Sequence, residues 1–467
     1  MMRSLFSGVS GLQNHQTRMD VIGNNISNIN TTGFKRNRVN FHDMLYQQLQ
    51  GAARPTAEVG GVNPREVGLG MSIASIDTIH IQGTLQTTGV QTDLAITGNG
   101  FFVLDDRGTQ LYTRAGAFSL DAEGILVNPA NGMRVMGWMA NEVDGGFTVL
   151  DVSRPVEQLE IPVGGKDPAR ATTIVNFACN LDKRIPELPE NPTEYQIFRS
   201  TWATSIYIFD SFGEAHTLQV EFTRVPGNPN SWTAEVVVNP QNEISTNTSV
   251  GFGEDDPEAG GATVFTLNFS NNGTLISAVD EDGNESGGAG YVQMFVGFDV
   301  PDADLNEDGT VFRQNFVLNL GEVGGFTNSM TQFAEASSTR MVEQDGRTMG
   351  YLDNFRIDQS GIINGIFSNG TSRVLGQVAL ATFANQGGLE KVGDNAFRQS
   401  NNSGLANIGA SGVAGRGRII SGTLEMSNVD MADQFVDMIV TQRGFQANSR
   451  TIQTADQLLQ ELLTLKR

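Results

Sequence analysis

Residues 23–35 read GNNISNINTTGFK and close a segment with a helical hydrophobic pattern. The apolar residues of this segment recur at steps of three, four or seven, at Leu5, Val9, Leu12, Met19, Ile22, Ile26 and Ile29. Such steps place side chains along one stripe of a helix. Asn and Gly are typical near a helix C-terminus, so the pattern predicts a helix that frays in the Asn-rich stretch and stops at Gly33. We assign residues 1–35 to an N-terminal helix.

The other end of the chain carries a similar stripe, which we assign to a C-terminal helix over residues 425–467. Its periodic residues are Val429, Phe435, Met438, Ile439, Phe445, Ile452, Ala455, Leu458, Leu459, Leu462 and Leu465. The N-terminal helix contains Gly8, Gly11 and Gly23, each costing about 0.5–1 kcal/mol relative to Ala in a helix interior. It therefore needs a partner, and the two stripes predict that the terminal helices pair in a coiled-coil-like layer, within one subunit or between neighbours.

Between the ends the hydrophobic period changes from 3.6 to 2, which is typical of strands. Short apolar segments alternate with turn formers. The clearest segments are 94–97, 100–104, 118–120, 125–127, 205–209, 218–222, 233–238, 264–269 and 312–318. The fold class is thus a mainly β multidomain protein, with β-sandwich or barrel-like domains, one inserted in another, and helical termini. We expect an extended linker or hairpin region at 36–90, an inner β-domain at 91–165 plus 336–424, and inserted outer β-domains at 166–335.

Composition excludes several classes of protein. The 30 Lys and Arg residues against 52 Asp and Glu give a net charge of −22, which repels phosphate backbones and disfavours nucleic acid as a partner. One Cys and four scattered His residues exclude a disulfide framework or a Cys/His zinc cluster. No apolar run approaches the roughly 18 residues that span a bilayer. Polar residues interrupt the apolar residues near the N-terminus, which does not fit a cleaved secretory signal peptide. We expect an exported protein to use another route.

Several long motifs resemble the signature of the flagellar axial proteins, the family of rod and hook subunits. They are residues 23–35, YTRAGAF at 112–118, SNVD at 427–430 and QRGFQANS at 442–449. Rod subunits resemble the chain only at its ends and first β-domain, so length favours the hook branch, with a distal rod subunit as the alternative.

The resemblance implies a non-enzymatic, cofactor-free structural subunit that self-assembles into the curved tube joining rod to filament. It also implies export without a cleaved signal peptide and a location in the flagellar basal body and hook. Implied partners are neighbouring hook subunits, the distal rod protein, the hook–filament junction protein, the hook cap and the export apparatus, without membrane insertion. Because the ends are glycine-weakened, we expect them to order only on assembly.

The single cysteine lies on the apolar side of an alternating segment. Val175, Phe177, Cys179 and Leu181 alternate with less apolar residues, so a buried inert thiol is the plain interpretation. The segment from Gly164 to Asn180 is, however, similar to the cross-linking segment of spirochaete hook proteins, in which lysinoalanine joins neighbouring subunits and the flagella are periplasmic. This resemblance implies self-catalysed bonding of Lys166 in one subunit to Cys179 in the next, with Asn180 assisting.

Alternatives stay open at this point. Lys166 has a plain interpretation as a solvated loop lysine, and Lys183 is the nearest rival nucleophile. The run Asp304–Asp308 resembles half of a calcium loop but has Asn315 at the twelfth position, where a bidentate carboxylate belongs. A secreted calcium-binding β-protein of the adhesin class and a glycosidase-like enzyme are therefore rival functions, although no paired-carboxylate motif supports the latter.

Overall fold

A computed structural model describes residues 2–52, 54–55, 60–143, 147–189, 193–240, 247–252, 262–281, 283–287, 290–300 and 312–465. The chain divides into two compact units. The first comprises Met1–Gly164, Asp353–Ile366 and Ser372–Arg467, and the second comprises Gly165–Leu352 and Phe367–Thr371. The return to the first unit comes later than residue 336, the expected boundary, because β26 (Ser338–Gln344) pairs with β15 (Ile174–Asp182) inside the second unit.

The first unit holds both long helices, α1 (Met2–Ser27) and α3 (Met431–Leu465). Its strands before the second unit are β1 (Asn37–Asp43), β2 (Tyr46–Gln50), β3 (Arg65–Gly68), β4 (Met71–Thr78), β5 (Leu85–Thr87), β6 (Leu94–Thr97), β7 (Phe101–Asp106), β8 (Thr109–Thr113), β9 (Ser119–Leu120), β10 (Leu126–Val127), β11 (Arg134–Val143), β12 (Phe147–Leu150) and β13 (Glu157–Gln158). Those after it are β28 (Ile362–Phe367), β29 (Ser372–Val378), β30 (Leu380–Thr382), β31 (Glu390–Gly393), β32 (Ala396–Arg398), β33 (Asn407–Gly409), β34 (Arg418–Ser421) and β35 (Thr423–Glu425), with a short 3₁₀ turn η1 (Gln386–Gly388).

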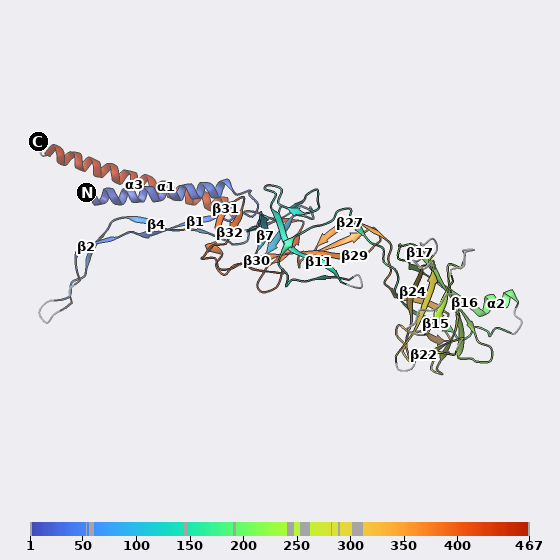
Figure 1. The fold of residues 1–467 in the computed structure, drawn as a ribbon. Coiled ribbons are helices and arrows are strands. Elements are labelled where there is room, and N and C mark those ends of the chain that lie inside the picture. The colour runs from blue at the N-terminus through green and yellow to red at the C-terminus, as the bar shows by residue number, and fades with distance from the viewer. Residues whose placement is uncertain are drawn as a thin grey trace. The chain divides into compact units, whose positions relative to one another are not determined.

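The sheet of the first unit runs in the order β28-β29-β11-β7-β8-β32-β31, and β6 and β5 pair with β34 and β35 from the C-terminal part of the chain. Segments far apart in sequence therefore complete one domain (Figure 1). The core of this sheet is aromatic, with Phe101, Tyr112 and Phe383 in edge-to-face contacts.

The second unit consists of two six-stranded sheets around one core. One contains β19 (Ser249–Gly251), β23 (Tyr291–Asp299), β24 (Arg313–Glu322), β15, β25 (Thr331–Phe333) and β26; the other contains β16 (Thr201–Phe209), β17 (Ala215–Arg224), β18 (Ser231–Val238), β20 (Val264–Phe269), β21 (Leu275–Asp280) and β22 (Glu285–Gly287). The short elements β14 (Lys166–Asp167) and α2 (Glu194–Ser200) lie outside this core, and β27 (Gly350–Ile357) crosses the division between the units. Burial alternates along β17, β18 and β20, which confirms the predicted mainly β fold with alternating strands.

Helix α1 ends at Ser27, earlier than the expected residue 35. The Asn28 side chain bonds back to the Asn24 carbonyl oxygen at 2.9 Å, and residues 28–33 form successive turns instead of helix. Gly33 has a φ of +69°, and a Cβ there would lie 2.5 Å from the Ala115 nitrogen. Gly33 is therefore required by a close backbone approach, which differs from the predicted role as a helix stop.

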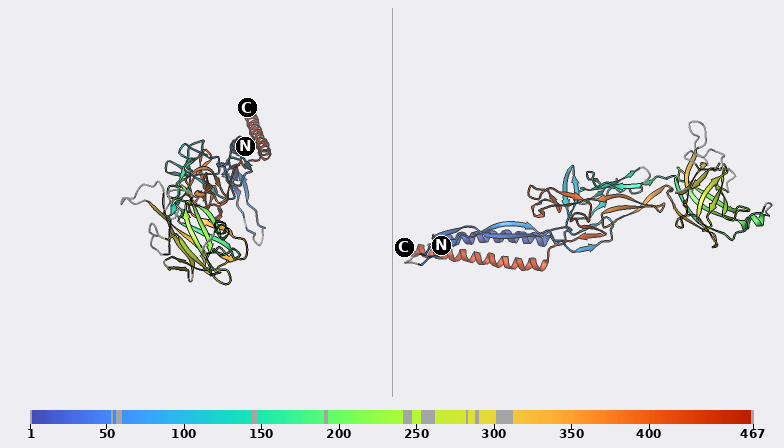
Figure 2. Two further views of the ribbon diagram at one scale, coloured as in Figure 1. Left: turned by 90° about the vertical axis from the view of Figure 1, so that its right-hand side faces the viewer. Right: turned by 90° about the horizontal axis from the view of Figure 1, so that it is seen from below.

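The terminal helices pair antiparallel, as the views in Figure 2 show, through a seam of polar and small residues. Residues of α1 spaced three or four apart meet residues of α3 with the same spacing; they are Gly8, Gly11, His15, Arg18, Ile22 and Asn25 facing Gln434, Asp437, Thr441, Gly444, Asn448, Thr451 and Ala455. Asn25 Nδ2 donates to Gln434 Oε1 at 2.9 Å, and Arg18 pairs with Asp437 at 3.0 Å. Pairing was predicted. Of the predicted stripe residues, Ile22 and Ala455 lie in this seam and Ile452 borders it at Gly8, while small and polar residues make up most of the rest.

An apolar stripe on α3 instead faces away from α1. Its members are 45–60% exposed and comprise Met431, Phe435, Val436, Ile439 and Val440. Monomeric proteins seldom expose so many adjacent large apolar side chains. We call these five residues the α3 stripe. None of the described helices combines the length and the apolar character needed to cross a bilayer.

Glycines of α1 should respond to substitution in opposite directions. A Cβ at Gly11 would lie 2.6 Å from Asn448 Nδ2, whereas one at Gly23 meets nothing within 4 Å. We expect Gly11→Val to separate the helices and Gly23→Ala to stabilise α1 by about 0.5–1 kcal/mol. Circular dichroism melts of assembled protein give the sign of each effect, and equal effects from the two substitutions would contradict the seam.

Candidate functional site

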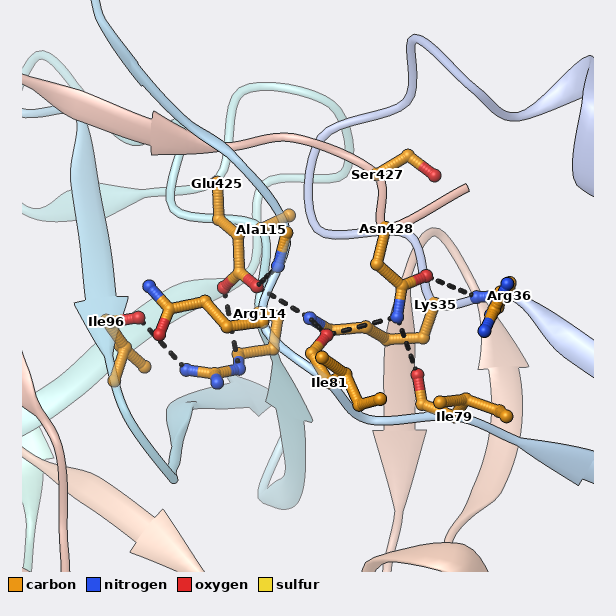
Figure 3. Close-up of polar contacts among 12 residues, drawn as sticks. Lys35, Arg36, Ile79, Ile81, Ile96, Arg114, Ala115, Glu425, Ser427 and Asn428 are labelled. Atoms are coloured by element: carbon orange, nitrogen blue, oxygen red, sulfur yellow. Dashed lines mark hydrogen bonds and ion pairs between the residues drawn. The ribbon is translucent and has the colours of Figure 1, made fainter. Parts of the chain in front are cut away.

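A buried cluster of three charges joins distant parts of the first unit (Figure 3). Lys35 Nζ lies 2.6 Å from Glu425 Oε1, and Arg114 Nε lies 3.6 Å from Glu425 Oε2. All three side chains are almost completely buried, with Lys35 and Glu425 at 1% and Arg114 at 4% exposure. Burial holds the pKa of Lys35 below its usual range, although Glu425 opposes the shift. The cluster thus holds two cations and one carboxylate.

Backbone groups satisfy the remaining bonds of this cluster. Lys35 Nζ donates to the Ile81 carbonyl oxygen at 2.8 Å, and Arg114 donates to the carbonyl oxygens of Ile96 and Gly98. The Gly83 amide donates to Glu425 Oε1 at 2.9 Å. The cluster therefore holds the backbone of residues 81–83 and of residues 96–98, where β6 leads into β7.

Asn428 adds a second polar connection beside the cluster. Its Oδ1 accepts from the Arg36 amide at 2.8 Å, and its Nδ2 donates to the carbonyl oxygens of Ile79 and Ile81. The Gly33 amide also donates to the Glu425 carbonyl oxygen at 2.7 Å. Residues 425–428, just before α3, are thus bonded to the segment that follows α1.

His80 lies next to this cluster and makes the stability of the first unit pH-dependent. Its ring packs at 5.7 and 5.5 Å from the rings of Phe101 and Phe397. Burial, and then the positive charges of Lys35, Lys391 and Arg114, lower the pKa of His80 to about 4.

A histidine with a depressed native pKa binds its proton more readily in the unfolded state. The free energy of unfolding should therefore fall as pH decreases from about 6.5 to about 4, by up to about 3 kcal/mol. Urea unfolding of the wild type and of His80→Gln at several pH values measures this contribution. A His80→Gln variant with the same pH slope as the wild type would contradict it.

Cys179 lies in the core of the second unit. The side chain is 5% exposed and packs in the cluster that contains Phe177, Leu181 and Phe222. Burial raises the pKa of the Cys179 thiol well above its usual range. In a single folded chain this sulfur is therefore a protonated, shielded thiol.

Lys166 and Cys179 lie on strand pairs that belong to different sheets. Lys166 pairs with Tyr351, and Cys179 pairs with Thr339. Cys179 lies in the buried core of the second unit, whereas Lys166 is on β14, outside that core. The structure therefore does not place the two residues on one strand pair. The Lys166 side chain is exposed.

Asn180 is occupied by bonds to a neighbouring strand. Its Oδ1 accepts from the Phe333 amide at 3.0 Å and from Thr331 Oγ1 at 3.3 Å, and its Nδ2 donates to the Glu335 carbonyl oxygen at 3.2 Å. The amide thus holds residues 331–335 against the strand that carries Cys179.

One group of potential metal ligands occurs among the described residues, at Asp210, Glu214 and His216. Asn239 Oδ1 accepts from the Thr217 amide, so its Nδ2 is the atom that donates to His216 Nδ1 at 2.8 Å. Nδ1 is therefore an acceptor, and the imidazole proton lies on Nε2, which faces Asp210 at 3.3 Å. The group forms a closed hydrogen-bond network in which a metal would have to displace that proton. The Asp304–Asp308 loop lies outside the described residues.

Sequence reasoning assigned no role to Lys35, Arg114 or Glu425. Two of them stood inside the quoted motifs at 23–35 and 112–118. The available signal was a single charged side chain inside each otherwise uncharged motif. Ionised groups are seldom buried without an oppositely charged partner, so each of these charges could have suggested an ion pair.

Four sequence profiles cover most of the chain in order. Residues 5–35 match "Flagella basal body rod protein" and 95–174 match "Flagellar hook protein FlgE/F/G D1 domain". Residues 180–347 match "Flagellar basal body protein FlaE D2 domain" and 420–465 match "Flagellar basal body rod FlgEFG protein C-terminal". Paired terminal helices that precede and follow these β-domains in the chain, together with the four matches, identify the class of flagellar axial proteins.

Comparison with individual proteins specifies the family. The chain is 58% identical over 467 residues to flagellar hook protein FlgE of Treponema pallidum and 51% identical over 466 residues to that of Borreliella burgdorferi, with each chain covered in full. The crystal structure of Helicobacter pylori flagellar hook protein FlgE2 matches with a TM-score of 0.48 and 15% identity, over 72% of this chain and 98% of that one. The chain belongs to the flagellar hook protein family and is a structural protein of the bacterial flagellum.

Proposed function

We propose that this subunit polymerises with copies of itself into the hook, and that the α3 stripe is buried between neighbouring copies. The exposed stripe carries this proposal: five large apolar residues on one helix remain uncovered by α1 or by the β-domains. Burying such side chains contributes about 1.5–3 kcal/mol each. A polymer of identical subunits can cover the stripe at every position along its length.

Polymerisation of the purified full-length subunit tests this proposal. Sedimentation and electron microscopy should show curved tubes above a critical concentration. Circular dichroism of monomer and tube then reports whether the terminal helices order on assembly. A protein that remains monomeric at all concentrations and salt conditions would contradict the proposal.

We infer further that neighbouring subunits become covalently joined, Lys166 of one to Cys179 of the next. The resemblance of residues 164–180 to the spirochaete cross-linking segment supports this, as do two spirochaete relatives above 50% identity. Burial is consistent with a bond between chains: Lys166 is exposed on β14, where a neighbouring subunit can reach it.

The chemistry balances without a cofactor. A base removes the Cys179 Cα proton, the Cβ–S bond breaks, and sulfur leaves as hydrosulfide, giving dehydroalanine. The neutral Lys166 amine then adds to Cβ, a new N–C bond forms, and the enolate carbon takes a proton. The net change is loss of one H₂S per bond. Lysine has an ordinary pKa of about 10.4, so the interface must desolvate the amine.

Burial of Cys179 makes the timing of this reaction depend on assembly. A shielded thiol in the folded monomer resists elimination, so the strand that carries it must open or shift when a neighbour docks. Asn180 is suited to control that step, because its three bonds hold residues 331–335 beside the strand. Its contribution is then positioning rather than direct stabilisation of the enolate.

Heating assembled tubes in denaturing detergent tests the covalent bond. Cross-linked tubes should give a ladder of oligomers that reducing agent does not dissolve, because a secondary amine replaces the thiol. Complete dissociation to monomer under all assembly conditions would contradict cross-linking while leaving polymerisation intact.

From the resemblance of its motifs to the flagellar axial proteins, we also propose export without a cleaved signal, contacts with the distal rod, the hook cap and the hook–filament junction, and a periplasmic location.

A further inference from the structure

The buried charge cluster contains two cations and only one anion, and polymerisation does not require this composition. Lys35 and Arg114 contribute two positive charges, and Glu425 is the carboxylate that faces both of them. Glu425 Oε2 makes no hydrogen bond to any described residue, although Arg114 Nε lies within ion-pair distance. One anion thus stabilises two buried cations from different parts of the sequence.

The three charges come from segments that meet only when both chain ends are docked. Lys35 follows α1, Arg114 lies just after β8, and Glu425 ends β35, shortly before α3. Each buried cation is costly without an opposite charge. Until Glu425 arrives, residues 33–36 cannot dock on the β-domain without burying Lys35 beside Arg114.

The backbone bonds depend on the same event. Gly33 and Gly83 donate to the carbonyl and carboxylate of Glu425, and Arg36 donates to Asn428. If residues 425–428 are undocked, all of these donors lose their acceptors together. The segment after α1 (residues 33–36), the connection at 79–83 and the segment before α3 (residues 425–428) therefore form one cooperative group.

We propose that Glu425 is a closing residue that orders both ends of the subunit in a single step: the segment after α1 docks only when the C-terminal segment, synthesised last, brings its carboxylate into the cluster. The two helices of a subunit thus become available to neighbours together. A subunit with only one end docked is not a stable intermediate.

The charge balance predicts unequal effects for the two members of the closest pair. Glu425→Gln leaves two buried cations without an anion, whereas Lys35→Met leaves Glu425 paired with Arg114. Breaking a buried pair by removing the only partner costs several kcal/mol, and each 1.4 kcal/mol is a factor of ten in an equilibrium. We expect Glu425→Gln to lower local protection about 100-fold or more, and Lys35→Met less than about tenfold.

Hydrogen exchange by mass spectrometry on the full-length subunit tests this proposal. Peptides covering 28–37, 79–84 and 423–430 should lose protection together in Glu425→Gln, while peptides from β7 and β8 keep theirs. Glu390→Gln is the matched control, since Glu390 pairs with Arg398 at 2.9 Å with both side chains 56% exposed, and it should change nothing.

Three outcomes would overturn the proposal. They are a response confined to 423–430, equal losses in Lys35→Met and Glu425→Gln, and a loss that extends to β7 and β8. The last would make Glu425 a general stabiliser of the domain rather than a coupling residue.

Discussion

Replacing Phe435 and Ile439 by Asp should abolish tube formation while leaving the β-domains folded. The two side chains are 47% and 50% exposed in the α3 stripe. Each substitution loses about 1.5–3 kcal/mol of apolar burial per interface and adds a charge that must be desolvated. We expect the critical concentration to rise at least about 100-fold, as sedimentation of the double variant would show.

A control variant uses two exposed apolar residues elsewhere in the first unit. Leu405 and Val413 are 84% and 57% exposed. The double change to Asp at these positions adds the same charge without touching α3, and it should assemble near the wild-type concentration. If both double variants assembled equally well, the α3 stripe would not be the subunit contact.

Cys179→Ala should assemble into tubes that dissociate completely to monomer in hot detergent. Cys179 is in the core, where loss of one sulfur atom destabilises the second unit by about 1 kcal/mol or somewhat more, too little to unfold it. Lys166→Ala should also assemble and lose the ladder, since Lys166 is exposed. The gel of each variant should therefore lack every band above the monomer.

Lys183→Ala distinguishes the proposed nucleophile from its nearest rival. Lys183 is exposed and close to Cys179 in sequence, so it tests proximity alone. A ladder that persists in Lys166→Ala but disappears in Lys183→Ala would reassign the bond.

Hydrophobic periodicity predicted the fold class, and each of the nine expected segments overlaps a strand of the structure. The expected segments 94–97 and 264–269 coincide with β6 and β20; burial alternates along β20, whereas the first three residues of β6 are all buried. Pairing of the terminal helices was also predictable, since neither helix is stable alone.

The seam and the charge cluster were not predictable from the same signal. The seam repeats as a heptad of small and polar residues, such as Gly11 and Asn25, and a search for apolar spacing does not detect these. The contact of Lys35 with Glu425 joins residues 390 positions apart. Local pattern marks Lys35 only as the one charged residue of its motif and does not mark Glu425. Gly8 and Gly11, which seemed from sequence only to weaken α1, allow it to approach α3 closely.

Cys179 illustrates a different limit. The alternation correctly predicts a buried thiol, which is compatible with both an inert core residue and a latent reactive one. Burial is the same in both roles, and in the proposed cross-link the reactivity of Cys179 depends on how a neighbouring subunit moves the strand that carries it.

Peptide mass spectrometry of assembled tubes tests the covalent account most directly. We predict a branched peptide pair joining Lys166 to residue 179, with a mass lower than the sum of the two peptides by one H₂S. Recovery of only unlinked peptides, with Cys179 intact as a thiol in fully assembled tubes, would contradict it.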